Sequence, residues 1–407
     1  MTEIVQLVEQ HLIKAGDPRF ALIDQAAFAS KNLYNLANYI VRQAFIHHKQ
    51  YLNYAAVYHL IKKSDAYQAL PRKVSQLVLK QVDDNWRGFL AAMRQWKAHP
   101  EKFLGRPGLP QYKDKQQGRN ILIYNDQAFS RAMLRKGLIK PSGLDITVET
   151  DHREVDQIRI VSRKAYYVVE VVYSVEVEEN PQLNSDFIAG IDIGLNNLAA
   201  LTSNKPGFCP RLVNGRPLKA INQFYNQRKA ELQSKLTGPR KTSKRISQLS
   251  HQRNRKIKHY LHNASRQIID HLVTEKIGML VIGKNNNWKQ KINIGRVNNQ
   301  AFVAIPHARF VDMLSYKAKL AGIKVVTTEE SYTSKISFLD LEPIRKNKTY
   351  AGQRIKRGLF RASDGTLINA DVNGSGNIIR KVVPNAFQAD GIQDFVVRPL
   401  GFKPING

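Results

Sequence analysis

One apolar segment, Phe187-Ile-Ala-Gly-Ile-Asp-Ile-Gly194, constrains the fold most strongly, because an acidic residue lies in its middle. A run this apolar predicts a strand that is buried on both faces of a sheet. An ionised carboxylate there costs roughly several kcal/mol unless a cation or hydrogen-bond donors compensate it. Asp192 is therefore either a metal ligand, with Mg²⁺ the economical choice, or a strand-end carboxylate satisfied by backbone donors.

The charge of the chain indicates its class of partner. Among 407 residues, 63 Lys and Arg stand against 33 Asp and Glu, a formal charge of +30. Such an excess favours a polyanion, nucleic acid by default, with a membrane surface as the rival. The sequence has neither a long apolar run nor a signal segment, so we expect a soluble, cytoplasmic protein that does not bind membranes. The one cysteine, Cys209, excludes an internal disulfide and a cysteine-based zinc site.

The first half of the sequence predicts a helical lobe inserted into a small β-barrel. Residues 1–20 favour a first strand, and residues 21–104 have the three- and four-residue apolar spacing of a helical bundle. Gly105–Pro110 ends this pattern with two prolines and two glycines. Residues 105–182 then favour strands, above all the β-branched and aromatic run Ala165–Val177.

The second half, residues 183–407, alternates short apolar runs with helical segments. This alternation predicts a mixed α/β sheet with crossover helices, and hence a multidomain α+β protein overall. Long basic helices are expected within about 215–276, and a further helix over Ile305–Ala321. The expected strands, of which the first two form a hairpin, are Ile188–Ile193, Leu198–Thr202, Gly278–Ile282 and Gly322–Thr328.

Asp371, in Asn369-Ala-Asp-Val-Asn-Gly-Ser-Gly-Asn-Ile378, is the second candidate metal ligand. Phosphodiester chemistry with two metal ions needs carboxylates that come together from separate elements. Asp371 lies at the start of a predicted helix whose Gly374, Ser375 and Gly376 permit close packing on a strand. The alternative is that Asp371 simply caps this helix.

Taken together, these segments resemble the RuvC-like, RNase H-fold nuclease domain of the TnpB (OrfB) family, the transposon-encoded relatives of type V CRISPR effectors. Gly190–Leu198 is similar to the first catalytic motif of the family and Asn369–Ile378 to the third. Thr333-Ser334 matches the pair that opens the zinc-knuckle region. In element order the resemblance extends over essentially the whole chain: a helical recognition lobe, a small barrel or wedge domain, and the nuclease domain.

The resemblance implies an RNA-guided DNA endonuclease of a prokaryotic transposon, associated with the nucleoid. Its partners would be a guide RNA from the transposon end and double-stranded target DNA. The N-terminal lobe and barrel would read a short flanking motif beside the target. Two Mg²⁺ ions at a single site would then support phosphodiester hydrolysis.

The chain departs from the family at the second catalytic motif, where an apolar strand usually ends in Glu. Here the strand Met279–Ile282 runs into Gly283, so the expected carboxylate is missing. Glu329 and Glu330 follow the next predicted strand, and period-two alternation sends them to opposite faces. We expect Glu330 to complete the site, because a branch of the family that reads like this chain carries a relocated glutamate there.

Other readings of this departure remain open. Asp340 and Glu342 are fallback candidates, and solvated surface acids are the alternative for all of these residues. Without a third carboxylate, the chain would be a nuclease-dead, RNA-guided DNA-binding repressor. A structural RNA-binding protein would explain the charge but would leave Asp192 unexplained.

A second departure concerns the zinc-knuckle region, because no cysteine lies between Thr333 and Asp371. No zinc is therefore expected in this insertion, which covers about 333–368. The residues expected to form its core are Phe338, Leu339, Tyr350, Leu359 and Phe360. The cations expected to face nucleic acid are Arg354, Lys356, Arg357 and Arg361.

Residues 215–260 contain thirteen Lys or Arg and a single acid, Glu231. On helices this density predicts a surface that follows phosphates, with Arg245, Arg253, Arg255 and Lys256 as candidates. Trp288, Lys289 and Gln290 combine an aromatic ring, a cation and an amide, which suits stacking on an unpaired base beside a phosphate; an ordinary core position for Trp288 is the alternative. Polar residues on the first helix that could contact the duplex beside the target are Tyr34, Asn35, Asn38 and Tyr39.

Overall fold

The computed structural model describes residues 3–163, 165–238, 240–284, 296–387, 395, 397–402 and 404. Its internal contacts divide the chain into two compact units, one of residues 6–175 and one of residues 1–5 together with 176–407. We call them the N-terminal unit and the C-terminal unit. None of the helices in the described residues is both long and apolar enough to cross a membrane.

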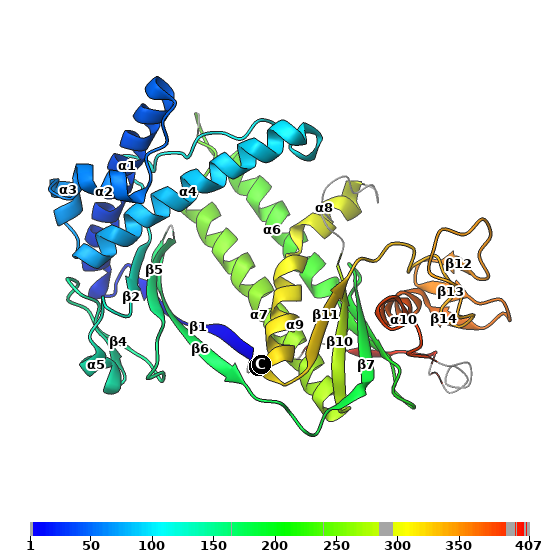
Figure 1. Ribbon diagram of the computed structural model, residues 1–407. Helices are drawn as coiled ribbons and strands as arrows, with labels where there is room; N and C mark the ends of the chain where they lie inside the picture. Colours follow the sequence, from blue (N-terminus) through cyan, green and yellow to red (C-terminus); the bar gives the residue numbers. More distant parts are fainter. Residues whose placement is uncertain are drawn as a thin grey trace. The chain divides into compact units, whose positions relative to one another are not determined.

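The N-terminal unit has the predicted order of one strand, then helices, then strands (Figure 1). Its helices are α1 (Arg19–His48), α2 (Tyr54–Ile61), α3 (Asp65–Gln68), α4 (Arg72–Ala98), a short 3-10 turn (Pro100–Lys102) and α5 (Arg131–Arg135). Its strands are β1 (Glu3–Lys14), β2 (Leu122–Asn125), β3 (Leu138–Ile139), β4 (Val148–Glu149), β5 (Gln157–Arg163) and β6 (Tyr166–Val177). Strand β1 pairs with β6, in the order β1-β6-β5-β2, while β3 and β4 form a separate ribbon. Because β1 and β2 are both edges, the described strands form an open sheet and do not confirm the predicted closed barrel.

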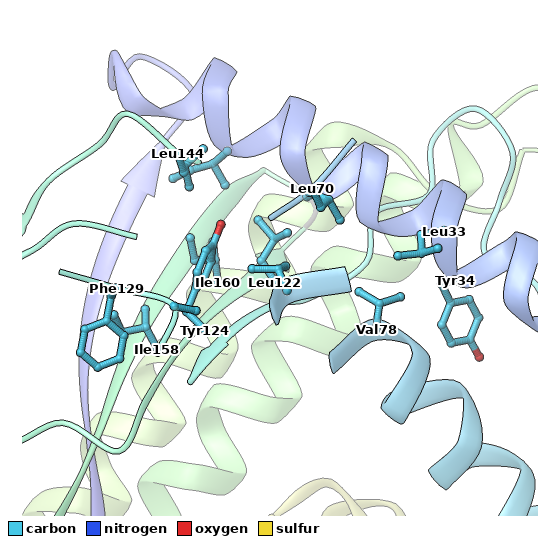
Figure 2. Close-up of a cluster of buried hydrophobic side chains, with 14 of the residues drawn as sticks. Leu33, Tyr34, Leu70, Val78, Leu122, Tyr124, Phe129, Leu144, Ile158 and Ile160 are labelled. Atoms are coloured by element: carbon cyan, nitrogen blue, oxygen red, sulfur yellow. The ribbon is translucent and has the colours of Figure 1, made fainter. Parts of the chain in front are cut away.

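Helices α1 and α4 pack on this sheet through alternate side chains. Leu33 of α1, Val78 of α4, Leu122 of β2 and Ile160 of β5 are all buried and belong to one hydrophobic cluster, part of which Figure 2 shows. Burying this surface removes about 25 cal/mol per Å² of unfavourable apolar hydration. The apolar side chains that recur at helical spacing in α1 and α4 and those that alternate along the strands therefore pack into one hydrophobic core.

The polar residues of α1 are used inside the N-terminal unit. Asn38 is fully buried; it accepts a hydrogen bond from Trp86 Nε1 at 2.9 Å and donates to the carbonyl of Pro110 at 3.1 Å. Tyr34 is buried too, and Asn35 donates to the carbonyl of Lys113 at 2.9 Å. The burial of Tyr34 and Asn38 therefore argues against their contacting a DNA duplex, whereas Asn35 is partly buried and Tyr39 is exposed.

The C-terminal unit contains the predicted mixed sheet. Its sheet strands are β7 (Asn184–Ile193), β8 (Asn197–Ser203), β9 (Arg211–Asn214), β10 (Ile277–Gly283), β11 (Lys324–Thr328) and β15 (Leu400–Phe402), in the order β11-β10-β7-β8-β9-β15. Strands β7 and β8 form the expected antiparallel hairpin, whereas β10 and β11 run parallel to their neighbours. The helices are α6 (Arg216–Ser234), α7 (Lys244–Thr274), α8 (Arg296–Ala304), α9 (His307–Leu320) and α10 (Ala370–Val382).

The two faces of β7 have different partners, as Figure 1 shows. Ala189, Ile191 and Ile193 point into the core that α7 and α9 complete. The alternate positions Gly190 and Asp192 face α10, since side chains alternate along a strand. A Cβ atom on Gly190 would lie 2.6 Å from the Ser375 carbonyl oxygen, and Ser375 Oγ donates to the Gly190 carbonyl at 2.8 Å. The predicted close packing of the Gly-Ser-Gly helix on a strand is confirmed.

The cysteine-free insertion contains the ribbon of β12 (Gln353–Lys356), β13 (Leu359–Arg361) and β14 (Leu367–Asn369). Phe338 and Phe360 are fully buried in its core, as expected. Side-chain amides of α10 replace the absent knuckle ligands as anchors: Asn373 accepts from the Phe338 N–H at 2.8 Å, and Asn377 donates to the Thr333 carbonyl at 3.0 Å. Buried hydrogen bonds and aromatic packing thus stabilise this loop against the helix that carries Asp371.

Candidate active site

Three predicted acidic residues come together where β7, β11 and α10 meet. Asp192 lies next to the end of β7, Glu330 two residues after β11, and Asp371 in the first turn of α10. Burial raises the pKa of Asp192 well above its usual range, the negative charges of Glu330 and Asp371 raise it further, and Arg354 opposes them. A Cβ atom on Gly374 would lie 2.7 Å from Asp192 Oδ2, so glycine is required for this approach.

The hydrogen bonds around the two aspartates bear on their structural alternatives. Asn369 is the cap of α10, since its Oδ1 accepts from the backbone N–H groups of Asp371 at 3.0 Å and Val372 at 3.3 Å. Asp371 is therefore not needed as a cap. Within the described residues, no protein donor hydrogen-bonds to the Asp192 carboxylate. Its negative charge is therefore compensated either by a bound cation or, as its raised pKa indicates, by protonation.

Glu330 occupies the space beside Gly283. The parallel register pairs Gly283 of β10 with Thr328 of β11, and the Lys284 N–H donates to the Thr328 carbonyl at 2.8 Å. A Cβ atom on Gly283 would collide with the Glu330 carboxylate and would lie 2.8 Å from Glu330 Cγ. Burial raises the pKa of Glu330 to about 7, and Lys381 opposes this shift. The Glu330 carboxylate can therefore take this position because Gly283 has no side chain.

The other acids lie elsewhere. The side chain of Glu329 is 62% exposed and lies 3.7 Å from Lys381 Nζ. Glu342 is buried, and its carboxylate accepts from the Ser337 N–H at 2.9 Å and from Asn347 at 2.8 Å. Asp340 accepts from the Ser363 N–H at 3.1 Å. These contacts give the two fallback candidates a structural role inside the insertion.

Two further polar side chains contact Asp371. Asn197, at the end of the turn that follows β7, donates to Asp371 Oδ2 at 2.7 Å. Arg354 of β12 lies with Nη2 3.7 Å from Asp371 Oδ1, and its side chain is 45% exposed. Asn197 belongs to the first-motif segment, but no local sequence pattern indicates its contact with Asp371. Arg354 was expected to face nucleic acid, and its place beside the carboxylates is visible only in the structure.

The donor set fits a hard divalent cation such as Mg²⁺, which prefers carboxylate oxygens. A bound cation would offset the repulsion between the negatively charged carboxylates of Asp192, Glu330 and Asp371, and this gain would favour its binding. Among the described residues, no three His, Cys, Asp or Glu side chains form a compact ligand set. Coordination of one cation by all three carboxylates therefore requires rotation of at least one side chain.

The raised pKa of Glu330 has a consequence for the stability of the folded protein without bound metal. A folded pKa of about 7, above the usual glutamate value of 4.5, means that the folded state holds this proton more tightly than the unfolded state. Stability from this group is fully present below about pH 4.5 and is lost as pH rises through about 7. In EDTA, we expect Glu330→Gln to melt at a higher temperature than the wild type at pH 8, with a smaller difference at pH 5. Equal pH profiles in thermal melts would contradict the burial of this charge.

The predicted nucleic-acid residues have different surroundings. Arg245, Arg255 and Lys256 are exposed on α7. Arg253 is partly buried; it donates to Asn222 at 2.8 Å and to the Ala304 carbonyl at 2.7 Å, so it ties α7 to α6 and α8. Arg357 is exposed in the turn after β12. Trp288, Lys289 and Gln290 lie outside the described residues.

Two protein-family models match segments between residues 170 and 378. The OrfB_IS605 family, described as a probable transposase, matches residues 170–289, which include Asp192. The TNB domain of Cas12f1-like proteins matches residues 307–378, which include Glu330 and Asp371.

Two curated proteins are similar in sequence. The CRISPR-associated endodeoxyribonuclease Cas12f2 of Micrarchaeota archaeon (strain CG1_02_47_40) is 28% identical over 235 residues, 54% of this chain and 41% of that protein. The TnpB-like protein ORF457 of Acidianus two-tailed virus is 22% identical over 391 residues, 87% of this chain and 82% of that protein. The match thus spans less than half of the Cas12f2 relative but most of the viral one.

The fold resembles that of Cas12f1. A cryo-EM structure of the Cas12f1-sgRNA-target DNA complex aligns with 87% of this chain and 81% of that chain, at a TM-score of 0.55 and 15% sequence identity. The similarity covers both compact units, which supports the α+β architecture predicted from the order of elements.

Proposed function

We propose that this chain, a relative of the TnpB proteins and the type V CRISPR effectors, is an RNA-guided DNA endonuclease. The carrying observation is the meeting of Asp192, Glu330 and Asp371 in the segments that match the transposase and Cas12f1-like models. In this proposal a guide RNA from the transposon end selects the target, and the N-terminal unit reads a short flanking motif in the DNA. The insertion of residues 333–368 contacts the target nucleic acid.

Asp192, Glu330 and Asp371 would hold two Mg²⁺ ions. When bound, such ions supply a water-derived nucleophile and neutralise charge at the scissile phosphate. The chain supplies the positions of these ligands. Gly283 and Gly374 leave the room that the Glu330 and Asp192 carboxylates need, and Asn197 holds one oxygen of Asp371.

Arg354 has a second role in the proposed site. Its guanidinium lies beside Asp371 and lowers the pKa of Asp192, so it partly neutralises the cluster. Because its side chain is half exposed on the β12–β13 ribbon, it can also donate to a phosphate oxygen of a bound strand. We propose that Arg354 stabilises the charge that develops on that phosphate during hydrolysis.

The nuclease-dead repressor loses its main motivation, because the Glu330 carboxylate lies where a side chain at position 283 would lie. One assay separates the two functions. The protein is purified with its bound RNA, the RNA is sequenced, and the complex is incubated with a matched plasmid and Mg²⁺. Cutting that depends on the guide sequence supports the endonuclease. Tight guided binding without cutting by the wild type would instead establish the repressor.

Replacing the exposed cations of α7 should change how the affinity for nucleic acid depends on salt. Each phosphate contact contributes roughly 0.7 to 0.9 to the slope of log affinity against log salt. Combined charge reversal at Arg245, Arg255 and Lys256 should therefore weaken nucleic-acid binding regardless of sequence and flatten this slope. Arg253→Gln is the matched control: it should lower the melting temperature but change the slope little, because Arg253 is bound to Asn222 and Ala304. An unchanged slope in the triple variant would show that this face of α7 contacts no phosphates.

A further inference from the structure

Helix α6 exposes an aromatic ring that no internal contact explains. Phe224 is 61% exposed, and no ring or cation of the described residues stacks on it. Its neighbour Tyr225, by contrast, lies under the Arg253 guanidinium at 5.5 Å. An exposed phenyl ring leaves apolar surface in contact with water, and its flat face is open to a partner.

The exposed face of α6 has the composition of a nucleic-acid surface. The residues exposed on this face, spaced three and four apart, are Arg216, Ala220, Gln223, Phe224, Gln227 and Arg228. They include cations and amides; one turn further along α6, the exposed Glu231 pairs with Arg228 and Lys235. The surrounding residues 215–260 carry thirteen Lys or Arg against this one Glu. This charge favours a polyanion over a protein partner, and an unpaired base offers a flat surface on which the ring can stack.

The base of α6 is fixed to the candidate active site. The Gly215 N–H donates to the Asn196 carbonyl at 2.7 Å, and Lys219 Nζ donates to Asn196 Oδ1 at 3.0 Å. Asn196 precedes Asn197, which holds Asp371. Phe224 lies eight residues beyond Arg216, or about 12 Å along the helix axis at 1.5 Å per residue. The first turn of α6 is therefore bonded to the same turn of the chain that contacts Asp371.

We propose that Phe224 is a stacking platform for an unpaired base of the DNA strand that enters the nuclease site. Gln223 and Gln227 flank the ring and can donate to the base or sugar, while Arg216 contacts a neighbouring phosphate; Arg228 is paired with Glu231. This inference rests on the proposed function, since it names the strand that the same site would cut. Stacking is tolerant of sequence because every base has a flat face, so this platform positions the strand without selecting bases.

The test measures binding in EDTA, where no DNA is cut. The full chain, with the RNA that co-purifies with it, is titrated with an oligothymidylate that carries one 2-aminopurine, whose fluorescence is quenched on stacking. Phe224→Leu keeps an apolar side chain but removes the ring. It should weaken binding roughly 5- to 150-fold, the range for one lost stacking contact, and abolish the quenching. The salt slope should not change, because no charge is removed.

Two controls separate stacking from loss of structure. Phe224→Tyr keeps the ring and should retain both affinity and quenching. Leu320→Ala removes another exposed apolar side chain, from α9, and should have no effect. Wild-type affinity and quenching in Phe224→Leu would overturn the proposal, as would quenching with an RNA oligonucleotide but not with DNA. Wild-type protein that binds and quenches but never cuts would refute the endonuclease and leave the stacking platform intact.

Discussion

Replacing Asp192 with alanine is expected to reduce DNA cleavage by about 10³-fold or more while leaving guided DNA binding largely unchanged. Metal ligands supply several kcal/mol of transition-state stabilisation, and each 1.36 kcal/mol corresponds to a factor of ten in rate. Binding relies instead on cations and base pairing, neither of which involves this carboxylate. The measurement is a single-turnover cleavage assay on a matched plasmid, paired with a binding assay on the same complex.

Asp186→Ala is the matched control for Asp192→Ala, because Asp186 lies on the same strand, β7, and is exposed. It should cut at the wild-type rate. Wild-type cutting by Asp192→Ala would show that the candidate site is not the nuclease site. Loss of both binding and cutting would indicate damage to the fold, which a thermal melt of the variant distinguishes.

Glu330→Gln is expected to silence cleavage as completely as Asp192→Ala. The amide has nearly the same shape but lacks the negative charge that a divalent cation requires. Glu329→Gln provides the comparison, since that side chain is exposed and contacts Lys381 rather than Asp192. It should remain largely active. If Glu330→Gln cut at nearly the wild-type rate, the glutamate assignment would be wrong, whatever the result for Asp192.

Gly283→Ala tests the same arrangement from the other side. An added Cβ would collide with the Glu330 carboxylate and with Ile378 Cδ1, at 2.7 Å. The variant keeps every acidic residue, yet we expect a large loss of cleavage because Glu330 must move. Unimpaired cutting by Gly283→Ala would show that Glu330 does not need its place beside β10.

Much of the site follows from residue patterns along the chain. Asp192 is visible as a charge within a buried strand, and Asp371 as an acid beside Gly-Ser-Gly, because each signal is local. The hairpin of β7 and β8, the parallel strands β10 and β11, and the basic helices also follow from local periodicity. The net charge of +30 indicates a polyanionic partner without reference to any fold.

Other features depend on contacts between distant segments. Alternation separates Glu329 from Glu330, but only the pairing of β10 with β11 puts the second of them beside Gly283. Arg253 and Arg255 look alike in sequence, yet only Arg253 is bound to Asn222 and Ala304.

The sequence by itself therefore determined the order of the elements, the two aspartates and the class of partner, since these depend on local pattern and composition. The tertiary structure decided which glutamate joins them, that Arg354 and Asn197 contact Asp371, and that Asn38 is buried instead of exposed. The physical reason is that a side chain's direction and hydrogen-bond partners are set by strand register and helix packing, which bring together residues far apart in the chain.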